Sequence, residues 1–281
     1  MKSTLDIVVP VYKKLDLFEK MAKNNLKYLF PNDRLIIVND CPEDDLTNLV
    51  KSLKMTNIIL IQDGVNRGFA GACNRGVGEV KSEQFFLINS DVKLISSSFH
   101  ELLGRFEKDE SIFSISLGQI EKNGELVGGN ELYWDGFLMQ HRGVKVEKER
   151  QNGWGEGGSS IFSTKKWRQL GGFDEILNPF YWEDVELGMR VSERGWKNIF
   201  VPSFQLEHHH ESTIKSFNSD EKITLIAMRN QLISNWKNLP KDKLLNHLIR
   251  LPFKLLRSAI GDRILLRGFF EAVKRKLFYN F

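Results

Sequence analysis

Short apolar runs alternate with helix-length segments along the first ninety residues of the chain. Four runs rich in Ile, Val and Phe predict strands: Leu5–Val11, Arg34–Asn39, Asn57–Gln62 and Gln84–Asn89. Three segments between them have the length and spacing of helices: Asp16–Leu29, Asp44–Lys54 and Phe69–Val80. This alternation is typical of βαβ units, which build an α/β fold around a parallel sheet that is buried on both faces.

Each of these strands is followed by polar or turn-forming residues. The four ends are Pro10-Val11-Tyr12, Asn39-Asp40, Asp63-Gly64 and Asn89-Ser90-Asp91. Ligands of open α/β sheets bind beyond the carboxyl ends of the strands. We therefore expect the functional site along this edge of the sheet.

The second half of the chain has a different pattern. From Lys122 to Gly158 the residues are Gly-rich and polar, which indicates loops and short strands that wall one side of a cleft. Helical patterns return at Lys165–Leu170, Glu183–Arg194 and Asp220–Leu239. A basic amphipathic segment follows, interrupted by Pro252 and Gly261. We expect one catalytic domain over residues 1–240 and a helical tail over residues 241–281.

Charge is divided unevenly along the chain. Residues 241–281 contain 10 Lys and Arg against 3 Asp and Glu, while the whole chain has a net charge of only +4, so the remainder is mildly acidic. This division favours a tail that binds a surface over a body that binds nucleic acid. The two cysteines, Cys41 and Cys73, define neither a disulfide framework nor a metal motif. The start of the chain does not look like an export signal, and no run approaches the roughly 18 apolar residues of a membrane span. We expect a cytoplasmic protein.

Asn89-Ser90-Asp91 and His208-His209-His210 are candidates for a cation site. Both follow strand-like runs, and a hard divalent cation such as Mg²⁺ prefers carboxylate oxygen and takes few protein ligands. Asp91 supplies such an oxygen, Asn89 a neutral polar contact, and His208 a nitrogen ligand if the fold brings it close. The alternatives are a turn that ends the strand and an exposed polar edge.

Two further motifs have both a structural and a chemical interpretation. Trp182-Glu183-Asp184-Val185-Glu186 begins a predicted helix, where acids either favour the helix dipole or supply a general base. Asn66-Arg67-Gly68, followed by Phe69-Ala70-Gly71-Ala72, is a helix start whose small residues allow close approach to a ligand or to the sheet. It is not a P-loop, because the Gly-Lys-Ser/Thr ending is missing.

The order of these motifs carries more information than any one of them. Along the chain the sequence contains PVY, VND, NRGFAGACNRG, NSD, GGFDE, WEDVELGMR and a Pro followed six residues later by His and then by Ser212. The series resembles the family-2 inverting glycosyltransferases, especially the rhamnosyltransferase-like members, over Leu5 to Leu239. The resemblance implies a single Rossmann-like A-type glycosyltransferase domain with a central, mostly parallel mixed sheet.

The resemblance also implies roles for individual residues. On the donor side it assigns the nucleotide base to Asp40, helped by Asn39 and Pro10-Val11-Tyr12, and the cation, Mg²⁺ or Mn²⁺, to Asp91 and His208. The motif's first acid is Asn89 here, a neutral residue that weakens cation binding. It assigns the general base to Asp184, beside Glu183. Further donor-binding candidates are Asn66, Arg67, Gly68, Ser90 and Gly158, and the stretch Gly157-Gly158-Ser159 is expected to line the cleft.

The implied reaction moves a sugar from a nucleoside diphosphate to a hydroxyl of a cell-surface glycan or a lipid-linked acceptor. The expected donors are dTDP-rhamnose or a UDP-hexose. A sugar nucleotidyltransferase is excluded because PVYKKLD, after the first strand, has no glycine-rich triphosphate loop. A non-catalytic protein that binds nucleotide sugars or glycans is the remaining alternative.

Two expectations concern the end of the chain. The polar segment Glu211–Lys222, including Lys215, is expected to close over the diphosphate. In the tail one apolar stripe recurs at helical spacing: Leu266, Phe269, Phe270, Val273 and Leu277. It either packs on the catalytic domain, forms a homodimer contact, or holds the protein on an anionic membrane at the inner face of the plasma membrane.

Overall fold

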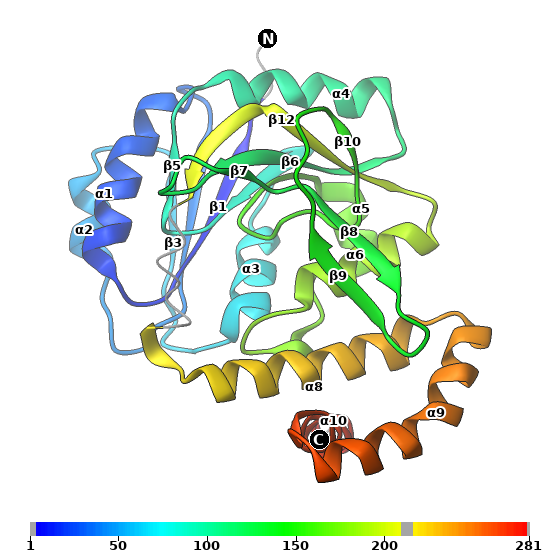
Figure 1. Cartoon of the computed structure of the whole chain (residues 1–281). Coiled ribbons are helices and arrows are strands. Elements are labelled where there is room, and N and C mark those ends of the chain that lie inside the picture. Colours follow the sequence, from blue (N-terminus) through cyan, green and yellow to red (C-terminus); the bar gives the residue numbers. More distant parts are fainter. Residues whose placement is uncertain (1–3, 209–215, 280–281) are drawn as a thin grey trace.

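The central sheet organises the molecule. The computed structural model describes residues 4–208 and 216–279 (Figure 1). The strands of the N-terminal half are β1 (Asp6–Val11), β2 (Arg34–Asn39), β3 (Ile58–Ile61), β4 (Gln84–Ile88) and β5 (Val92–Leu94). Those of the second half are β6 (Ile112–Ile120), β7 (Leu126–Val127), β8 (Asn130–Trp134), β9 (Met139–Gly143), β10 (Arg150–Asn152), β11 (Ser159–Ser163) and β12 (Lys197–His208). The four strands predicted in the first ninety residues are confirmed.

The sheet is mixed, with the order β10-β12-β6-β11-β4-β1-β2-β3. Strands β3, β2, β1 and β4 run parallel to one another, as the βαβ pattern predicts. Strand β11 lies antiparallel between β4 and β6, and β12 pairs in parallel with β6. Strand β8 pairs with β9 in a separate hairpin. The fold class is therefore the expected α/β class, with an N-terminal half of the sheet that is parallel and a second half that is mixed.

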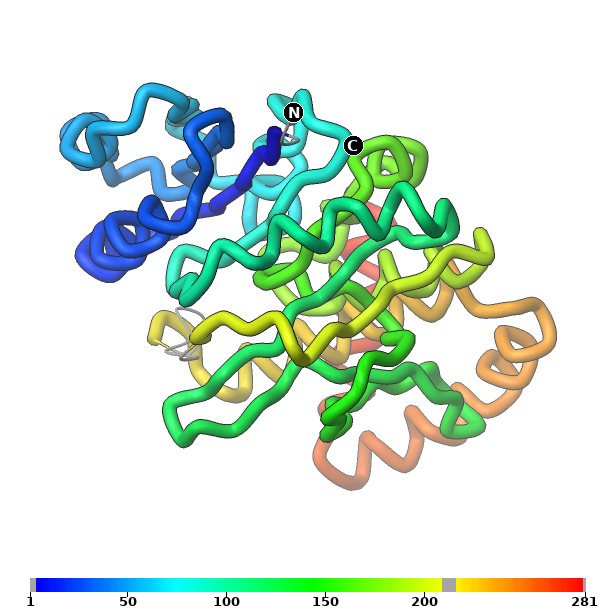
Figure 2. Tube along the Cα trace, turned by 90° about the horizontal axis from the view of Figure 1, so that it is seen from above, coloured from blue at the N-terminus to red at the C-terminus, as the bar shows by residue number. Residues whose placement is uncertain are grey.

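Helices cover both faces of the sheet and extend beyond it. They are α1 (Leu15–Asn25), α2 (Thr47–Ser52), α3 (Gly68–Gly78), α4 (Leu103–Lys108), α5 (Thr164–Leu170), α6 (Glu183–Glu193), α8 (Asp220–Asn238), α9 (Lys241–Ile260) and α10 (Ile264–Phe278). The first βα units and α9 lie at opposite ends of the molecule in both ribbon views (Figures 1 and 2). None of the helices among the described residues is both long and apolar enough to cross a membrane.

Helix α3 lies directly against the sheet because its inner face carries small residues. Gly76 faces β1 and β2 so closely that an added Cβ would lie 2.5 Å from Val8 Cγ1 and 2.9 Å from Val38 Cγ2. Ala70, Ala72 and Cys73 are also buried on this helix. The small residues on the inner face of α3 therefore pack the helix against the sheet, as one of the two interpretations predicted.

The C-terminal helices pack on α8 and on the β8–β9 hairpin. Gly268 of α10 abuts Met228 of α8, and Phe269 packs edge-on against Trp236 with ring centroids 5.9 Å apart. The predicted tail stripe is divided by this packing, since Phe270 and Leu277 remain exposed. The expected interruption at Pro252 is wrong, because α9 continues through it, whereas the helix ends before Gly261 as expected.

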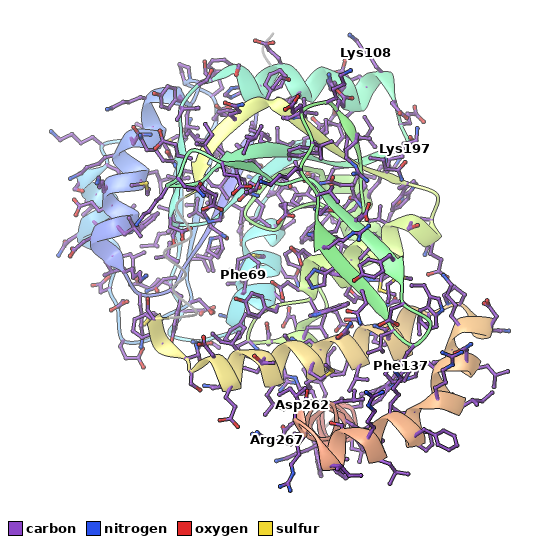
Figure 3. The ribbon with its side chains drawn as sticks, viewed as in Figure 1. Phe69, Lys108, Phe137, Lys197, Asp262 and Arg267 are labelled. Carbon is purple, nitrogen blue, oxygen red and sulfur yellow. The ribbon has the colours of Figure 1, made fainter. Side chains whose placement is uncertain are left out.

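Helix α9 and the hairpin share a polar contact at the hairpin tip. His247, fully buried, donates from Nδ1 to the carbonyl oxygen of Phe137 at 2.9 Å and accepts from Trp236 Nε1 through Nε2 at 2.9 Å. Met139 N donates to Asn235 Oδ1 of α8 at 2.6 Å. Phe137 is labelled at this junction in Figure 3. The hairpin is therefore fixed to the C-terminal helices.

The packing of α3 gives a first prediction. Gly76→Ala should lower the free energy of unfolding by about 1–3 kcal/mol, because the new methyl group overpacks two β-branched side chains in the core. Gly78→Ala on the same helix is the matched control, since its nearest neighbour would be Arg75 Nη1 at 3.8 Å. It should be neutral or stabilise by up to about 1 kcal/mol. Urea unfolding measures both, and equal effects would contradict the close approach.

Candidate functional site

The structure brings Asp91 and His208 together. Strand β12 runs antiparallel to β5, with His208 opposite Val92, so the two candidate cation ligands end up as neighbours. His208 Nε2 lies 3.2 Å from Asp91 Oδ1. His208 is almost fully buried, and Asp91 keeps 14% of its side chain exposed. The Asp91 carboxylate is therefore partly exposed to solvent, whereas the His208 imidazole is covered.

Gln119 fixes the orientation of His208. Its Oε1 lies 2.6 Å from His208 Nδ1, and because an amide oxygen only accepts, Nδ1 carries the proton. In the neutral ring Nε2 then presents its lone pair towards Asp91. A histidine that donates one N–H to an oxygen and offers its other nitrogen beside a carboxylate is the usual arrangement of a metal ligand.

Asp91 and His208 suit a cation that also binds the phosphate oxygens of a ligand. No group of three or more His, Cys, Asp or Glu able to hold a metal occurs within residues 4–208 and 216–279. Mg²⁺ and similar cations commonly take one or two protein ligands and complete their shell with phosphate oxygens and water. The donor set of Asp91 and His208 therefore suits a cation shared with a diphosphate. His209, His210, Ser212 and Lys215 lie outside the described residues.

The ends of β1 and β2 form the second part of the site. Asp40 N donates to Val11 O at 2.8 Å, and Asp40 Oδ1 accepts from Arg67 N at 2.6 Å, so this carboxylate joins β2 to the start of α3. Burial raises the pKa of Asp40 to about 6, although the Arg67 N–H opposes the shift. Val11 is buried in β1 beside Pro10, while Tyr12 is exposed. An open pocket beside these strand ends is lined by Lys13, Lys14, Cys41 and Glu43.

Three donor-binding candidates have structural partners. Asn39 Nδ2 donates to Asp44 O at 2.7 Å and its Oδ1 accepts from Cys41 N at 3.0 Å, which shapes the loop after β2. Arg67 forms a two-point ion pair with Asp63, at 2.7 and 2.8 Å. Asn66 Oδ1 accepts from Gly68 N at 3.1 Å at the start of α3. The hydrogen bonds and the ion pair of these three residues fix the shape of the loops beside the site.

Gly157 and Gly158 connect the cation side of the site to the acids of α6. An added Cβ at Gly158 would lie 2.3 Å from Asn89 Nδ2, and Asn89 N donates to Gly158 O at 3.2 Å. The neighbouring Gly157 donates its N–H to the Asp184 carboxylate. Ser159 then begins β11, where it is paired with Ile88. Ser90 follows Asn89 and is half-buried. Gly158 thus contacts Asn89 and Gly157 contacts Asp184, so these two adjacent glycines connect the two side chains.

Glu183 and Asp184 occupy different environments at the start of α6. Glu183 is buried, and its Oε2 has no hydrogen-bond partner in the part of the chain that the structure describes. Burial, reinforced by the neighbouring Asp184, raises the pKa of Glu183 to about 8. Burial also raises the pKa of Asp184, but only to about 6, because the N–H groups of Val185 and Gly157 stabilise the carboxylate. Asp184 therefore ionises at a lower pH than Glu183.

A third acid, Glu156, belongs to the same group, and sequence reasoning missed it. Its Oε1 accepts from Asn130 Nδ2 at 2.8 Å, and its N–H donates to Ser116 Oγ at 3.2 Å. Burial and the charge of Asp184 raise the pKa of Glu156 to about 8. A single acid between glycines, in Trp154-Gly155-Glu156-Gly157-Gly158, was the available signal. It provides a neutral carboxyl group beside the ionised Asp184.

His141 of the β8–β9 hairpin lies against two buried tryptophans next to the acids. His141 of β9 packs edge-on against Trp154 and Trp182, with centroids 5.5 and 5.1 Å apart. Trp182 directly precedes Glu183. The expectation that the segment Lys122–Gly158 forms loops and short strands is confirmed, and its hairpin is what brings His141 to the acids.

Other residues of the recognised motifs hold the site in shape. Glu186 accepts from Arg190 Nε and Nη2 at 2.9 and 2.6 Å, and Arg190 also donates to the carbonyl oxygens of Leu170 and Gly172. Asn74 exchanges two hydrogen bonds with the backbone of Phe173. The third acid of WEDVELGMR, Glu186, and the second Asn of NRGFAGACNRG, Asn74, therefore anchor the loop before α6.

Part of the segment expected to close over the diphosphate is described. Phe217 packs edge-on against Tyr12 at a centroid distance of 6.5 Å, and Lys13 Nζ lies 4.7 Å from the Phe217 ring centroid. This places Phe217 beside the end of β1. Closure of the segment remains a prediction.

Comparison with known proteins gives one family match and a set of related structures. The model of glycosyl transferase family 2 matches residues 6–166. A solved structure of GalNAc-T7 with UDP, GalNAc and Mn²⁺ superposes with a TM-score of 0.66 at 14% sequence identity, over 83% of this chain and 47% of that one. The similarity to this structure supports the A-type glycosyltransferase fold.

Two curated relatives are similar over shorter regions. One is the N-acetylglucosaminyl-diphospho-decaprenol L-rhamnosyltransferase of Mycobacterium tuberculosis, 41% identical over 74 residues, which are 26% of this chain and 24% of the relative. The other is the UDP-Glc:alpha-D-GlcNAc-diphosphoundecaprenol beta-1,3-glucosyltransferase WfaP of Escherichia coli, 24% identical over 124 residues, 44% of this chain and 49% of the relative. The matched regions span about a quarter to a half of these relatives.

The burial of Glu183 gives a second prediction. Because its pKa in the folded protein is above that of an unfolded chain, the folded state retains a proton that the unfolded state loses, and stability falls as pH rises from about 4.5 to about 8. Glu183→Gln removes this dependence. The melting temperature of the variant minus that of the parent should increase by several degrees from pH 5 to pH 8.5. A change of 1 kcal/mol in the free energy of unfolding corresponds to about 2–4 °C in melting temperature.

Glu193→Gln, an exposed carboxylate at the other end of α6, is the control for this measurement. It should shift the melting temperature equally at both pH values. A Glu183→Gln difference that does not change with pH would show that Glu183 is ionised in the folded protein.

Proposed function

Because the chain belongs to glycosyl transferase family 2, we propose that it is an inverting enzyme that transfers a sugar from a nucleoside diphosphate to a lipid-linked or polysaccharide acceptor. The observation that carries the proposal is that two chemically different groups are linked through one short run of backbone. Asp91 and His208 form one group and Asp184 belongs to the other, and Asn89, Gly158 and Gly157 connect them. Inverting transfer needs a base on one face of the sugar and a site for the leaving diphosphate on the other.

Asp184 is the proposed general base. It is the acid of the group that is ionised at neutral pH, with a pKa near 6, and it is held in place by two backbone N–H groups. A pKa close to the working pH lets a carboxylate remove a proton from the attacking hydroxyl in the transition state. Glu183 and Glu156, protonated beside it, keep competing negative charge away and leave Glu156 able to donate to an acceptor oxygen.

Asp91 and His208 are the proposed ligands of a divalent cation, Mg²⁺ or Mn²⁺. The orientation of His208 by Gln119 supports this role, as does the presence of Mn²⁺ in the related GalNAc-T7 structure. Such a cation, when bound, neutralises the charge that develops on the leaving diphosphate. Asp40 and the ends of β1 and β2 would hold the nucleoside, with Tyr12 exposed for a contact to the base.

The proposed donors are dTDP-rhamnose and UDP-hexoses, and the proposed acceptor is a sugar on a polyprenyl diphosphate. The two curated relatives support this substrate class, because their names state rhamnosyl and glucosyl transfer to N-acetylglucosamine on such a lipid. His141, which is exposed and lies edge-on against the buried Trp154 and Trp182, is placed to pack against an acceptor sugar ring. Release of nucleoside diphosphate from a donor panel, with and without acceptor, separates this enzyme from a non-catalytic binding protein.

The third prediction concerns the base. Asp184→Asn should lower kcat by about 10²–10⁴-fold while leaving the melting temperature and the affinity for UDP or dTDP close to those of the parent. In the parent, kcat/KM should fall about tenfold for each pH unit below about 6, since only the ionised carboxylate accepts a proton. Initial rates of nucleoside diphosphate release over pH 5 to 8 measure both. Normal transfer by Asp184→Asn would remove this residue from the role.

The fourth prediction concerns the cation. Asp91→Ala should abolish the Mn²⁺-dependent part of UDP or dTDP binding in calorimetry, and Gln119→Leu should weaken it about 10–100-fold by releasing the His208 ring. Glu110→Ala, an exposed acid before β6, is the control and should bind as the parent does. If His208→Ala titrates with Mn²⁺ and UDP like the parent, His208 has a structural role only.

A further inference from the structure

Helix α9 carries more exposed large apolar side chains than any other element of the described chain. Six of its side chains are half to almost fully exposed: Leu245, Leu248, Ile249, Phe253, Leu256 and Ile260. Phe253 exposes 72% and Ile260 91% of their surface. Exposed apolar residues scattered singly need no explanation, but a contiguous row along one helix marks a site of interaction.

The spacing of these residues places them on one side of the helix. At about 100° per residue they fall within a sector of about 140°, opposite to the sector of His247, Leu251 and Ser258, which are buried. The two sectors of the helix differ in their packing. The inner one fixes α9 to Phe137 and Trp236, and the outer one extends about 23 Å along the helix without a partner among the described residues.

Basic side chains border the outer face. Arg250 and Arg257 lie beyond one edge at helical spacing, Lys254 lies nearer to the buried sector, and Lys241 lies at the other edge near the start of the helix. All four are exposed, although Lys254 Nζ also lies 5.4 Å from the Phe137 ring centroid. The one acid in α9 is Asp242, in its first turn. An apolar face bordered by cations is the pattern of a helix that lies in the surface of an anionic bilayer.

We propose that α9, and not the α10 stripe alone, is the element that docks the protein on an anionic lipid surface, with its apolar face in the bilayer and Arg250 and Arg257 at the lipid phosphates. A second copy of the chain would satisfy the apolar face, but it would bring the same cations towards one another. Charge complementarity therefore favours lipid as the occupant.

Docking through α9 positions the cleft as well as the protein. The helix holds the tip of the β8–β9 hairpin through His247 and Phe137, and the middle of β9 carries His141 against Trp182, next to Glu183. The value of this arrangement for a lipid-linked acceptor depends on the proposed function. The docking itself does not, because it depends only on the exposed face of α9 and its charges.

Flotation of the full chain with vesicles tests the proposal. With vesicles of phosphatidylcholine containing about one third phosphatidylglycerol at low salt, the parent should float, and with phosphatidylcholine alone it should stay at the bottom. Arg250→Gln/Arg257→Gln should lower the bound fraction about tenfold or more. Lys108→Gln is the matched control, an exposed cation on α4 at the far side of the molecule in Figure 3, and should float like the parent.

Phe253→Gln/Leu256→Gln/Ile260→Gln should abolish flotation without loss of folding, because all three side chains are exposed; circular dichroism and the melting temperature check this. A parent that does not float at low salt, or a triple variant that floats equally well, would overturn the proposal. A dimeric parent whose triple variant is monomeric, with no flotation of either, would assign the face to a contact between copies. Nucleoside diphosphate release without vesicles should be unchanged in every α9 variant, so a failure of the proposed function is detected separately.

Discussion

The close approach of Gly158 to Asn89 is the constraint on which the candidate site depends. Any other residue there would have to displace the Asn89 side chain, because a Cβ would overlap the Asn89 amide. The contact starts the antiparallel pairing of β11 with β4, which turns a parallel α/β sheet into a mixed one. It also places the preceding residue, Gly157, where its N–H donates a hydrogen bond to the Asp184 carboxylate. The parallel half and the mixed half of the sheet are thus joined next to the site through backbone atoms.

A second consequence of this arrangement is electrostatic. Three acids share a poorly solvated part of the cleft, and such a group is stable only if most of its members are protonated. The backbone N–H groups of Val185 and Gly157 select Asp184 as the charged member. Glu183, without any hydrogen bond to Oε2, and Glu156, which has only neutral donors, retain their protons. Position in the helix start, rather than residue type, decides which acid is ionised.

Much of the fold could be predicted from the sequence, because local patterns determine it. Strand β2 begins and ends at the predicted residues, and α6 differs from its prediction by one residue. The roles of the acidic and polar motifs follow from their positions at strand ends and helix starts. The neighbourhood of Asp91 and His208 is not local, because it requires β12 to bend and shift register along β6 before it reaches β5. Only the family resemblance linked these two residues.

Other features escaped prediction for a physical reason. Glu156 is set among glycines and has no periodic pattern around it, so its importance appears only when Asn130 and Asp184 are placed beside it. In the tail, hydrophobic spacing identified a stripe on α10, but the face that packs there is the small-residue face of Gly268 and Ala272. Periodicity locates an apolar face without telling which neighbour covers it. Pro252 shows the converse, since tertiary packing of Leu251 and His247 keeps α9 continuous despite a helix-breaking residue.

The long separation of Asp91 and His208 in the sequence has a thermodynamic meaning. In an unfolded chain the two side chains belong to the ends of a loop of more than a hundred residues, and closing such a loop costs entropy that the folded sheet has already supplied. Any ligand that needs both side chains must therefore bind the native state almost exclusively, and its binding energy adds to the stability of the β5–β12 pairing. A small ion at this position would act as a reversible crosslink, and the protein's resistance to unfolding would depend on its concentration.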